Sequence, residues 1–201
     1  MILLMRSDAS SLVVDKLCDM AGEQNAAIAV SCFYIDFGAR EVQSPTNILG
    51  SLLKQIIGKL EMILDEISRM FQDHKKVIGG RGLRVPEIVK LLQAVASSQQ
   101  TFICIDAVDE CVERHRPEVL DSLRQILEKS PNTRIFLTGR RHSVSEIDKH
   151  LGERARILFI KPKHGDIVGY MRLSNDTSLD SMGDGPEDEM IHGITDNIAE
   201  T

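Results

Sequence analysis

Three acidic residues directly follow a short apolar run in the middle of the chain. The residues of Phe102–Ile105 are apolar or cysteine, Asp106 comes next, and Asp109 and Glu110 follow after two intervening residues. A continuous apolar run bounded by polar residues is typical of a strand buried on both faces of a parallel sheet. Carboxylates are costly to bury without partners, so three of them at the end of such a strand indicate a binding site rather than packing.

The chemistry that needs this pattern is Mg²⁺-dependent nucleotide binding. An aspartate at a strand end can hold a hydrated metal ion, and a nearby acid can orient or deprotonate an attacking water. The run therefore matches an extended Walker B motif, in which Asp106 is the candidate metal residue. The alternative is a buried strand followed by a solvated acidic turn, because strands that end in acidic residues are common.

A second apolar run, residues 134–138, ends at Thr138 and is followed by Gly139 and Arg140. In open parallel sheets, ligands bind at the carboxyl ends of the strands, so we expect this run to end beside Asp106. The planar fork of an arginine suits phosphate oxygens, and Thr138 is a weaker candidate for a hydroxyl contact. The alternative is that Arg140 is an ordinary surface arginine next to Arg141.

Stretches of helical periodicity alternate with the apolar runs. Helices are predicted at residues 10–21, 44–57, 61–74, 86–97, 117–129 and 143–151, with another beginning at residue 165. Strands are predicted at residues 26–33, 102–105, 134–138 and 156–160, and residues 113–116 are expected to form a charged loop. This alternation predicts an α/β fold: a parallel sheet with helices on both faces.

Composition favours a soluble globular protein. The net charge is -6, but residues 174–201 contain eight of the 30 acids and none of the 24 basic residues, which leaves the preceding part slightly positive. Nothing in this distribution indicates a nucleic-acid surface, and no segment is apolar over the length of a membrane span. The four cysteines lack metal-ligand spacing and are expected to be reduced thiols in a cytoplasmic protein.

The glycine cluster Gly79-Gly80-Arg81-Gly82 has two interpretations. A phosphate loop would be followed by Lys-Ser or Lys-Thr and preceded by a strand, and this cluster has neither feature. A flexible loop is the interpretation that the surrounding residues favour.

The order of these motifs resembles a known family. FICIDAVDEC, then RIFLTGR about one helix later, then KHLG, is similar to a NACHT domain of the signal-transduction NTPase class. Among NACHT domains, the sequence most resembles the nephrocystin-3-like N-terminal domain that is found upstream of ankyrin, WD or tetratricopeptide repeats. SSLVVDKL, FYIDF and PTNILGSLLKQI are similar to connecting segments of that family, so the resemblance covers almost the whole chain.

The resemblance implies roles for the candidate residues. Asp106 matches the aspartate that organises Mg²⁺, and Asp109 and Glu110 match the acidic pair that activates water. Arg140 matches the sensor 1 arginine that contacts the γ-phosphate, with Thr138 beside it as a second nucleotide contact. The implied cofactor is Mg²⁺ with ATP or GTP.

The chain departs from the family before its first helix. The family has a strand and a G-x-x-x-x-G-K-S/T loop there, whereas this sequence reads MILLMRSDA and contains no glycine before Gly22. A backbone cradle for phosphate is therefore not expected, although Arg6 and Ser7 fall near the usual Lys-Thr. The resemblance thus implies a truncated NACHT-type domain over residues 1–173, in which the first strand and the phosphate loop are missing or replaced. Residues 174–201 are expected to form an acidic tail or the start of another segment.

Two functions remain open from the sequence. The first is a nucleotide-dependent signalling switch whose binding and hydrolysis are weak or absent in this chain. The second is a non-catalytic module that binds other protein domains or repeats and retains only the fold. The expected partners are nucleotide in the parent family and protein domains, with homo-oligomers possible in longer relatives, and neither nucleic acid nor membrane. A hydrolase of another kind is not expected, because the sequence shows no recognisable nucleophile–base pair.

The apolar N-terminus, Met1–Met5, is predicted to form a short parallel strand. We expect it between the strand that ends at Asp106 and the strand that ends at Thr138, because either strand would otherwise expose an unpaired apolar edge.

Overall fold

The computed structural model describes residues 4–5, 8–23, 28–58, 68–69, 82–152 and 155–157. Its centre is a parallel four-stranded sheet in the order β1-β4-β3-β2. The strands are β1 (Leu4–Met5), β2 (Ile28–Tyr34), β3 (Gln100–Asp106) and β4 (Thr133–Thr138). The helices are α1 (Asp8–Glu23), α2 (Pro45–Ile57), α4 (Val85–Ser98), α5 (Arg116–Lys129) and α6 (Val144–Leu151). Short 3-10 turns are η1 (Phe37–Val42), η2 (Val108–Glu110) and η3 (Arg141–Ser143).

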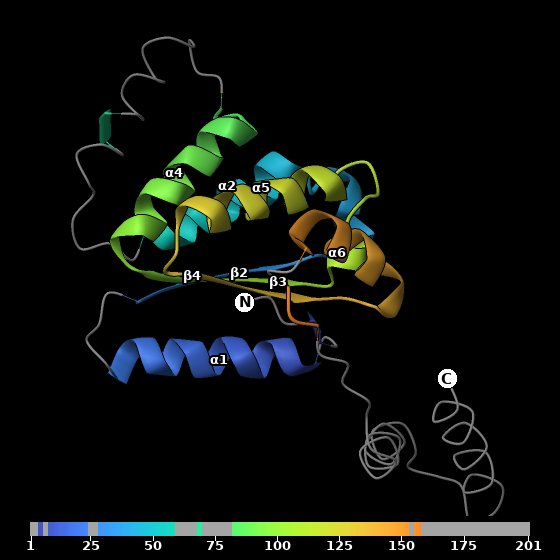
Figure 1. Cartoon of the computed structure of the whole chain (residues 1–201), viewed down its shortest axis with the longest axis horizontal. Helices are drawn as coiled ribbons and strands as arrows, with labels where there is room; N and C mark the ends of the chain where they lie inside the picture. Colours follow the sequence, from blue (N-terminus) through green and yellow to red (C-terminus); the bar gives the residue numbers. More distant parts are fainter. Residues whose placement is uncertain are drawn as a thin grey trace, which may run out of the picture. The chain divides into compact units, whose positions relative to one another are not determined.

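Helices cover both faces of the sheet, which confirms the predicted fold class. Helix α1 packs on one face, and α2, α4 and α5 lie on the other (Figure 1). Strand β3 shows why both faces are needed: Ile103 and Ile105 belong to the large core under α2, α4 and α5, whereas Cys104 packs with Val14 of α1 and Phe136 of β4. A strand that is apolar on both sides must be buried on both sides.

Helix α2 follows from its local sequence. The Ser44 side chain accepts a hydrogen bond from the Asn47 amide at 3.3 Å, and Pro45 occupies the first turn. A capping serine and a proline in the first turn are both typical of a helix start. The apolar positions at helical spacing are all buried: Ile48, Leu49, Leu52, Leu53 and Ile56.

The place of β1 differs from the predicted one. β3 and β4 pair directly with each other, from Thr101 opposite Thr133 to Ile105 opposite Leu137, and leave no gap for another strand. β1 pairs instead with the outer side of β4, with Leu4 opposite Leu137. The prediction failed because the apolar pattern identifies a strand but does not fix which edge it joins.

Two further predictions have defined outcomes. The helix predicted at residues 143–151 is confirmed as α6, and it ends at Gly152, whose φ of 54° is typical of a glycine that follows a helix. The expected charged loop at residues 113–116 is wrong at its end, because Arg116 begins α5 and is buried. Three predictions lie wholly or largely outside the described residues: the helix at residues 61–74, the glycine cluster apart from Gly82, and everything predicted beyond residue 157.

Candidate functional site

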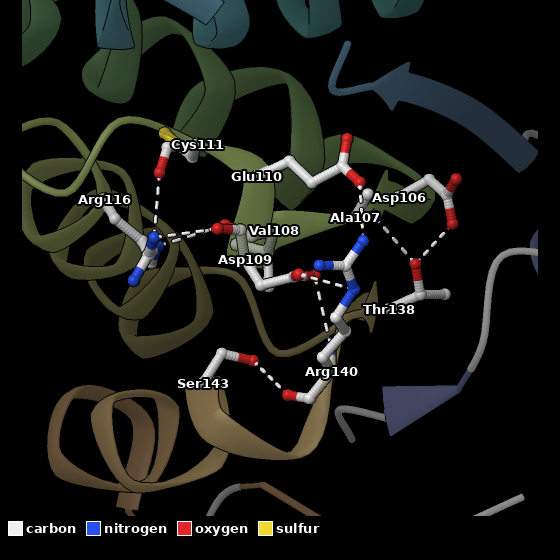
Figure 2. A network of polar contacts seen from close by, with 10 residues as sticks. All are labelled: Asp106, Ala107, Val108, Asp109, Glu110, Cys111, Arg116, Thr138, Arg140 and Ser143. Atoms are coloured by element: carbon white, nitrogen blue, oxygen red, sulfur yellow. Dashed lines mark hydrogen bonds and ion pairs between the residues drawn. The ribbon is translucent and has the colours of Figure 1, made fainter. Parts of the chain in front are cut away.

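The carboxyl ends of β3 and β4 place Asp106 and Thr138 side by side (Figure 2). The Thr138 hydroxyl donates to Asp106 Oδ1, and its oxygen accepts the Ala107 amide proton at 2.8 Å. Thr138 is 1% exposed and Asp106 is 8% exposed. Thr138 therefore fixes both the carboxylate and the first residue of the turn that follows it.

Ala107 redirects the chain immediately after the strand. Its φ of 55° and ψ of 48° are left-handed, and among the described residues no other non-glycine residue has a positive φ. Side chains disfavour this region, so the surrounding contacts must hold it. The Glu110 amide then donates to the Ala107 carbonyl at 2.9 Å and closes η2. This turn carries Asp109 and Glu110 to the end of β4.

Asp109 and Glu110 both contact Arg140. The backbone amide of Arg140 donates to Asp109 Oδ1 at 3.1 Å, and Nε of the Arg140 side chain lies 3.6 Å from Asp109 Oδ2. Arg140 Nη2 lies 3.5 Å from Glu110 Oε1. The exposed fractions of the side chains are 4% for Asp109, 25% for Glu110 and 72% for Arg140. The guanidinium thus covers two acids while most of it remains open to solvent.

Gly139 permits this close approach of the two strand ends. A Cβ at this position would lie 3.2 Å from Asp109 Oδ1, 3.2 Å from Val108 Cγ1 and 3.0 Å from Ser143 Oγ. Contacts of this length are tighter than side-chain carbons normally make, so with any other residue the side chains of Asp109, Val108 and Ser143 would have to shift by a few tenths of an ångström.

Arg116 is a residue of this site that sequence reasoning missed. At 8% exposure it is buried, and its Nε donates to the Val108 carbonyl at 3.1 Å. Its Nη2 donates to the carbonyls of Asp109 and Cys111, each at 2.9 Å, and its Nη1 pairs with Glu146 Oε2 at 2.7 Å. One signal could have found it: a cation in the first turn of a helix opposes the helix dipole, so an arginine there needs another reason.

Nearby thiols and Tyr34 do not supply a nucleophile. Burial, followed by the charge of Cys32, raises the pKa of Cys104 to about 12. Burial also raises the pKa of Cys111. The pKa of Tyr34 is raised by burial first and by the charges of Cys32 and Asp106 second. These groups are therefore protonated near neutral pH.

The site supplies one kind of metal ligand. In the described part of the chain, no group of three or more histidine, cysteine or acidic side chains could hold a metal ion by itself. Asp106 is nevertheless a hard oxygen donor at a strand end, and Mg²⁺ usually takes only one or two carboxylates together with water and substrate phosphates. The residues therefore fit Mg²⁺ that arrives with a nucleotide.

The fold thus brings together, at one edge of the sheet, all the residues predicted from the sequence: Asp106, Asp109, Glu110, Thr138 and Arg140 (Figure 2). Thr138 and Asp109 are largely enclosed, whereas Glu110 and Arg140 are more accessible. No helix in the described ranges is long and apolar enough to cross a membrane.

Comparisons with known proteins agree with this fold. The family model described as nephrocystin 3, N-terminal matches residues 6–140, more than half of the chain. The ORC1 protein of Aeropyrum pernix, solved in complex with DNA, is 16% identical to this chain and superposes with a TM-score of 0.53. The match covers 88% of this chain and 43% of the ORC1 chain. A Walker-type ATPase of Pyrococcus abyssi is 15% identical to this chain and superposes with a TM-score of 0.52. The match covers 96% of this chain and 57% of the ATPase chain.

The reach of these similarities is limited to the fold. This chain spans about half of the length of the solved chains that it resembles. No curated protein matches the sequence. The identities are low, so the two solved structures show a shared α/β fold, and the DNA in the first of them belongs to that protein.

Proposed function

Because the chain belongs to the nephrocystin 3 N-terminal family, we propose that it contains the acidic and arginine-bearing part of a NACHT-type nucleotide-binding switch domain. The single observation that carries this proposal is the network in which the ends of β3 and β4 join Asp106, Asp109 and Glu110 to Thr138 and Arg140. Acids that bind metal and activate water, beside an arginine that can pair with phosphate, are the parts that nucleotide hydrolysis requires.

Each residue has a distinct role in this proposal. Asp106 would hold Mg²⁺, which when bound neutralises phosphate charge. Thr138, whose hydroxyl is held by Asp106 and Ala107, acts by orienting the metal aspartate rather than by reaching the nucleotide. Of the two remaining acids, Glu110 is the better candidate for orienting a water, because Asp109 is almost fully enclosed.

The pairing of Arg140 with the acids supports a switch. Its ion pairs to Asp109 and Glu110 are 3.6 and 3.5 Å long, and its side chain is largely exposed. Exposed ion pairs of this kind contribute at most about 1 kcal/mol, so a bound phosphate could replace them at little cost. Arg140 would then pair with the acids when no nucleotide is present and with phosphate when it is bound.

Nucleotide binding by these 201 residues should be weak. The sequence contains no G-x-x-x-x-G-K-S/T run, and the residues before α1 include no glycine. Charge-assisted hydrogen bonds contribute about 1.5–3 kcal/mol each. Losing two or three of them would weaken binding on the order of a thousandfold, at about 1.4 kcal/mol per factor of ten.

The same observation favours a second function. A chain without a phosphate loop can keep the fold as a non-catalytic module that binds other protein domains or repeats. In that case the network around Asp106 would only stabilise the turn after β3, and nucleotide would bind without dependence on this residue or would not bind at all.

Titration calorimetry with Mg·ATP and Mg·GTP separates the two functions. For a switch domain we expect weak binding that disappears when Mg²⁺ is removed and in Asp106→Asn. The matched control is Asp148→Asn on α6, which changes an exposed aspartate and should bind as the unmodified chain does. A submicromolar dissociation constant would contradict weak binding, and affinity that is unchanged in Asp106→Asn would favour the non-catalytic module.

A further inference from the structure

Arg116 and the turn after β3 form a second network behind the acids. Three backbone carbonyls of this segment, those of Val108, Asp109 and Cys111, accept protons from one guanidinium (Figure 2). The carbonyls at the end of a 3-10 turn lack partners within it, whereas the Val108 carbonyl at its start also accepts the Cys111 amide proton at 3.3 Å. Arg116 therefore holds the backbone of the turn from the side opposite Arg140.

Only arginine can make this set of contacts. Its Nε and Nη2 reach the carbonyls while Nη1 pairs with Glu146 at 2.7 Å. A guanidinium has five donors in a rigid planar fork, whereas a lysine ammonium has three donors at one point. The exposed fractions of the Arg116 and Glu146 side chains are 9% and 26%, so this is a largely buried ion pair that is costly to break.

The network closes into a ring that includes Arg140. Ser143 donates to the Arg140 carbonyl through its amide at 3.1 Å and its hydroxyl at 2.8 Å. Ser143 ends η3, and α6, which starts at the next residue, carries Glu146. Glu146 holds Arg116, Arg116 holds the backbone of Asp109, and the Asp109 carboxylate holds Arg140. Asp109 and Arg140 are thus linked twice, once by their direct contact and once through Arg116, Glu146 and α6.

We propose that Arg116 is a positioning residue that sets Asp109 and Glu110 against Arg140, and that Glu146 of α6 fixes the place of its guanidinium. The inference rests on the proposed function, because that function assigns the chemistry to these acids and to Arg140. It adds a way for α6 to affect the site, since a shift of Glu146 would move the turn that carries both acids.

The experiment measures exchange of the Arg140 backbone amide in the nucleotide-free chain by NMR. This amide donates to Asp109 Oδ1, so its exchange rate reports whether the turn is in place. In Arg116→Lys we expect exchange of the Arg140 amide to accelerate about tenfold, the effect of losing a hydrogen bond to a charged acceptor. Two controls lie on α5: Arg124→Lys changes a half-buried arginine that pairs with Glu128, and Ile126→Val lowers stability from the core.

The controls separate positioning from general destabilisation. A purely structural Arg116 would accelerate exchange at Arg140 no more than Ile126→Val does, and that result would overturn the inference. If Arg116→Lys fails to fold, Glu146→Ala decides, because the Glu146 side chain is more exposed and the variant keeps the arginine itself while removing the carboxylate that fixes its guanidinium. We expect a smaller acceleration in the same direction, and an unchanged Arg140 amide in Glu146→Ala would equally overturn the inference.

This measurement is independent of nucleotide binding. If the unmodified chain shows no Asp106-dependent nucleotide binding while Arg116→Lys frees the Arg140 amide, the positioning role stands and the proposed function fails. If nucleotide binds as expected and the Arg140 amide does not respond to either variant, only the positioning role fails.

Discussion

Thr138→Val tests how strongly the ends of β3 and β4 depend on one hydroxyl. The substitution keeps the shape of the side chain but removes the donor to Asp106 and the acceptor of the Ala107 amide. Hydrogen bonds to charged groups contribute about 1.5–3 kcal/mol and neutral ones about 1 kcal/mol. Ala107 is only half-buried, so water can compensate in part, and we expect the free energy of unfolding to fall by about 2–3 kcal/mol.

Thr138→Ser is the matched control. It keeps the hydroxyl and removes one buried methyl group, which costs about 1 kcal/mol. Urea denaturation of the two variants should therefore differ by about 1–2 kcal/mol, with the valine variant less stable. If Thr138→Val were as stable as Thr138→Ser, the hydroxyl would not hold the site together, and the reasoning from this pair of hydrogen bonds would be refuted.

A double-mutant cycle sharpens the same prediction. In Asp106→Asn the amide oxygen can still accept the Thr138 proton, so the hydrogen bond survives without its charge. Thr138→Val should then cost less in the Asp106→Asn background than in the unmodified chain, by about 1 kcal/mol. Equal costs in both backgrounds would show that Thr138 and Asp106 are not coupled.

Two further predictions concern neighbouring residues. Gly139→Ala should lower the free energy of unfolding by about 1–3 kcal/mol, because its Cβ would meet Asp109 and Val108. The control Gly22→Ala places a Cβ with nothing within 4 Å in helix α1, where alanine is favoured over glycine, so it should not lower the stability. If Gly139→Ala were as stable as the unmodified chain, the steric argument would be contradicted. Cys104, with its pKa raised to about 12 by burial, should react with iodoacetamide far more slowly at pH 8 than the exposed thiol of Cys18, measured by mass spectrometry of the native chain, and rapid labelling of Cys104 would contradict its burial.

Local patterns in the sequence predicted most of the described elements and the residues that meet at the ends of β3 and β4. The apolar run before Asp106 predicts a doubly buried strand, which is confirmed because neighbouring residues determine the burial pattern. The alternation of strands and helices also placed Asp106 and Arg140 at the same edge, since parallel strands share the edge at which they end.

The tertiary structure alone decided the lateral order of the strands and the partners of each polar group. The predicted place for the N-terminal strand was wrong, because edge pairing depends on contacts between distant segments such as β3 and β4. Arg116 was expected in a charged loop, because a charged residue in a polar stretch carries no local sign that it will be buried. Its contacts with Val108, Asp109 and Glu146 form only once β3, α5 and α6 have packed together, so no local pattern could reveal them.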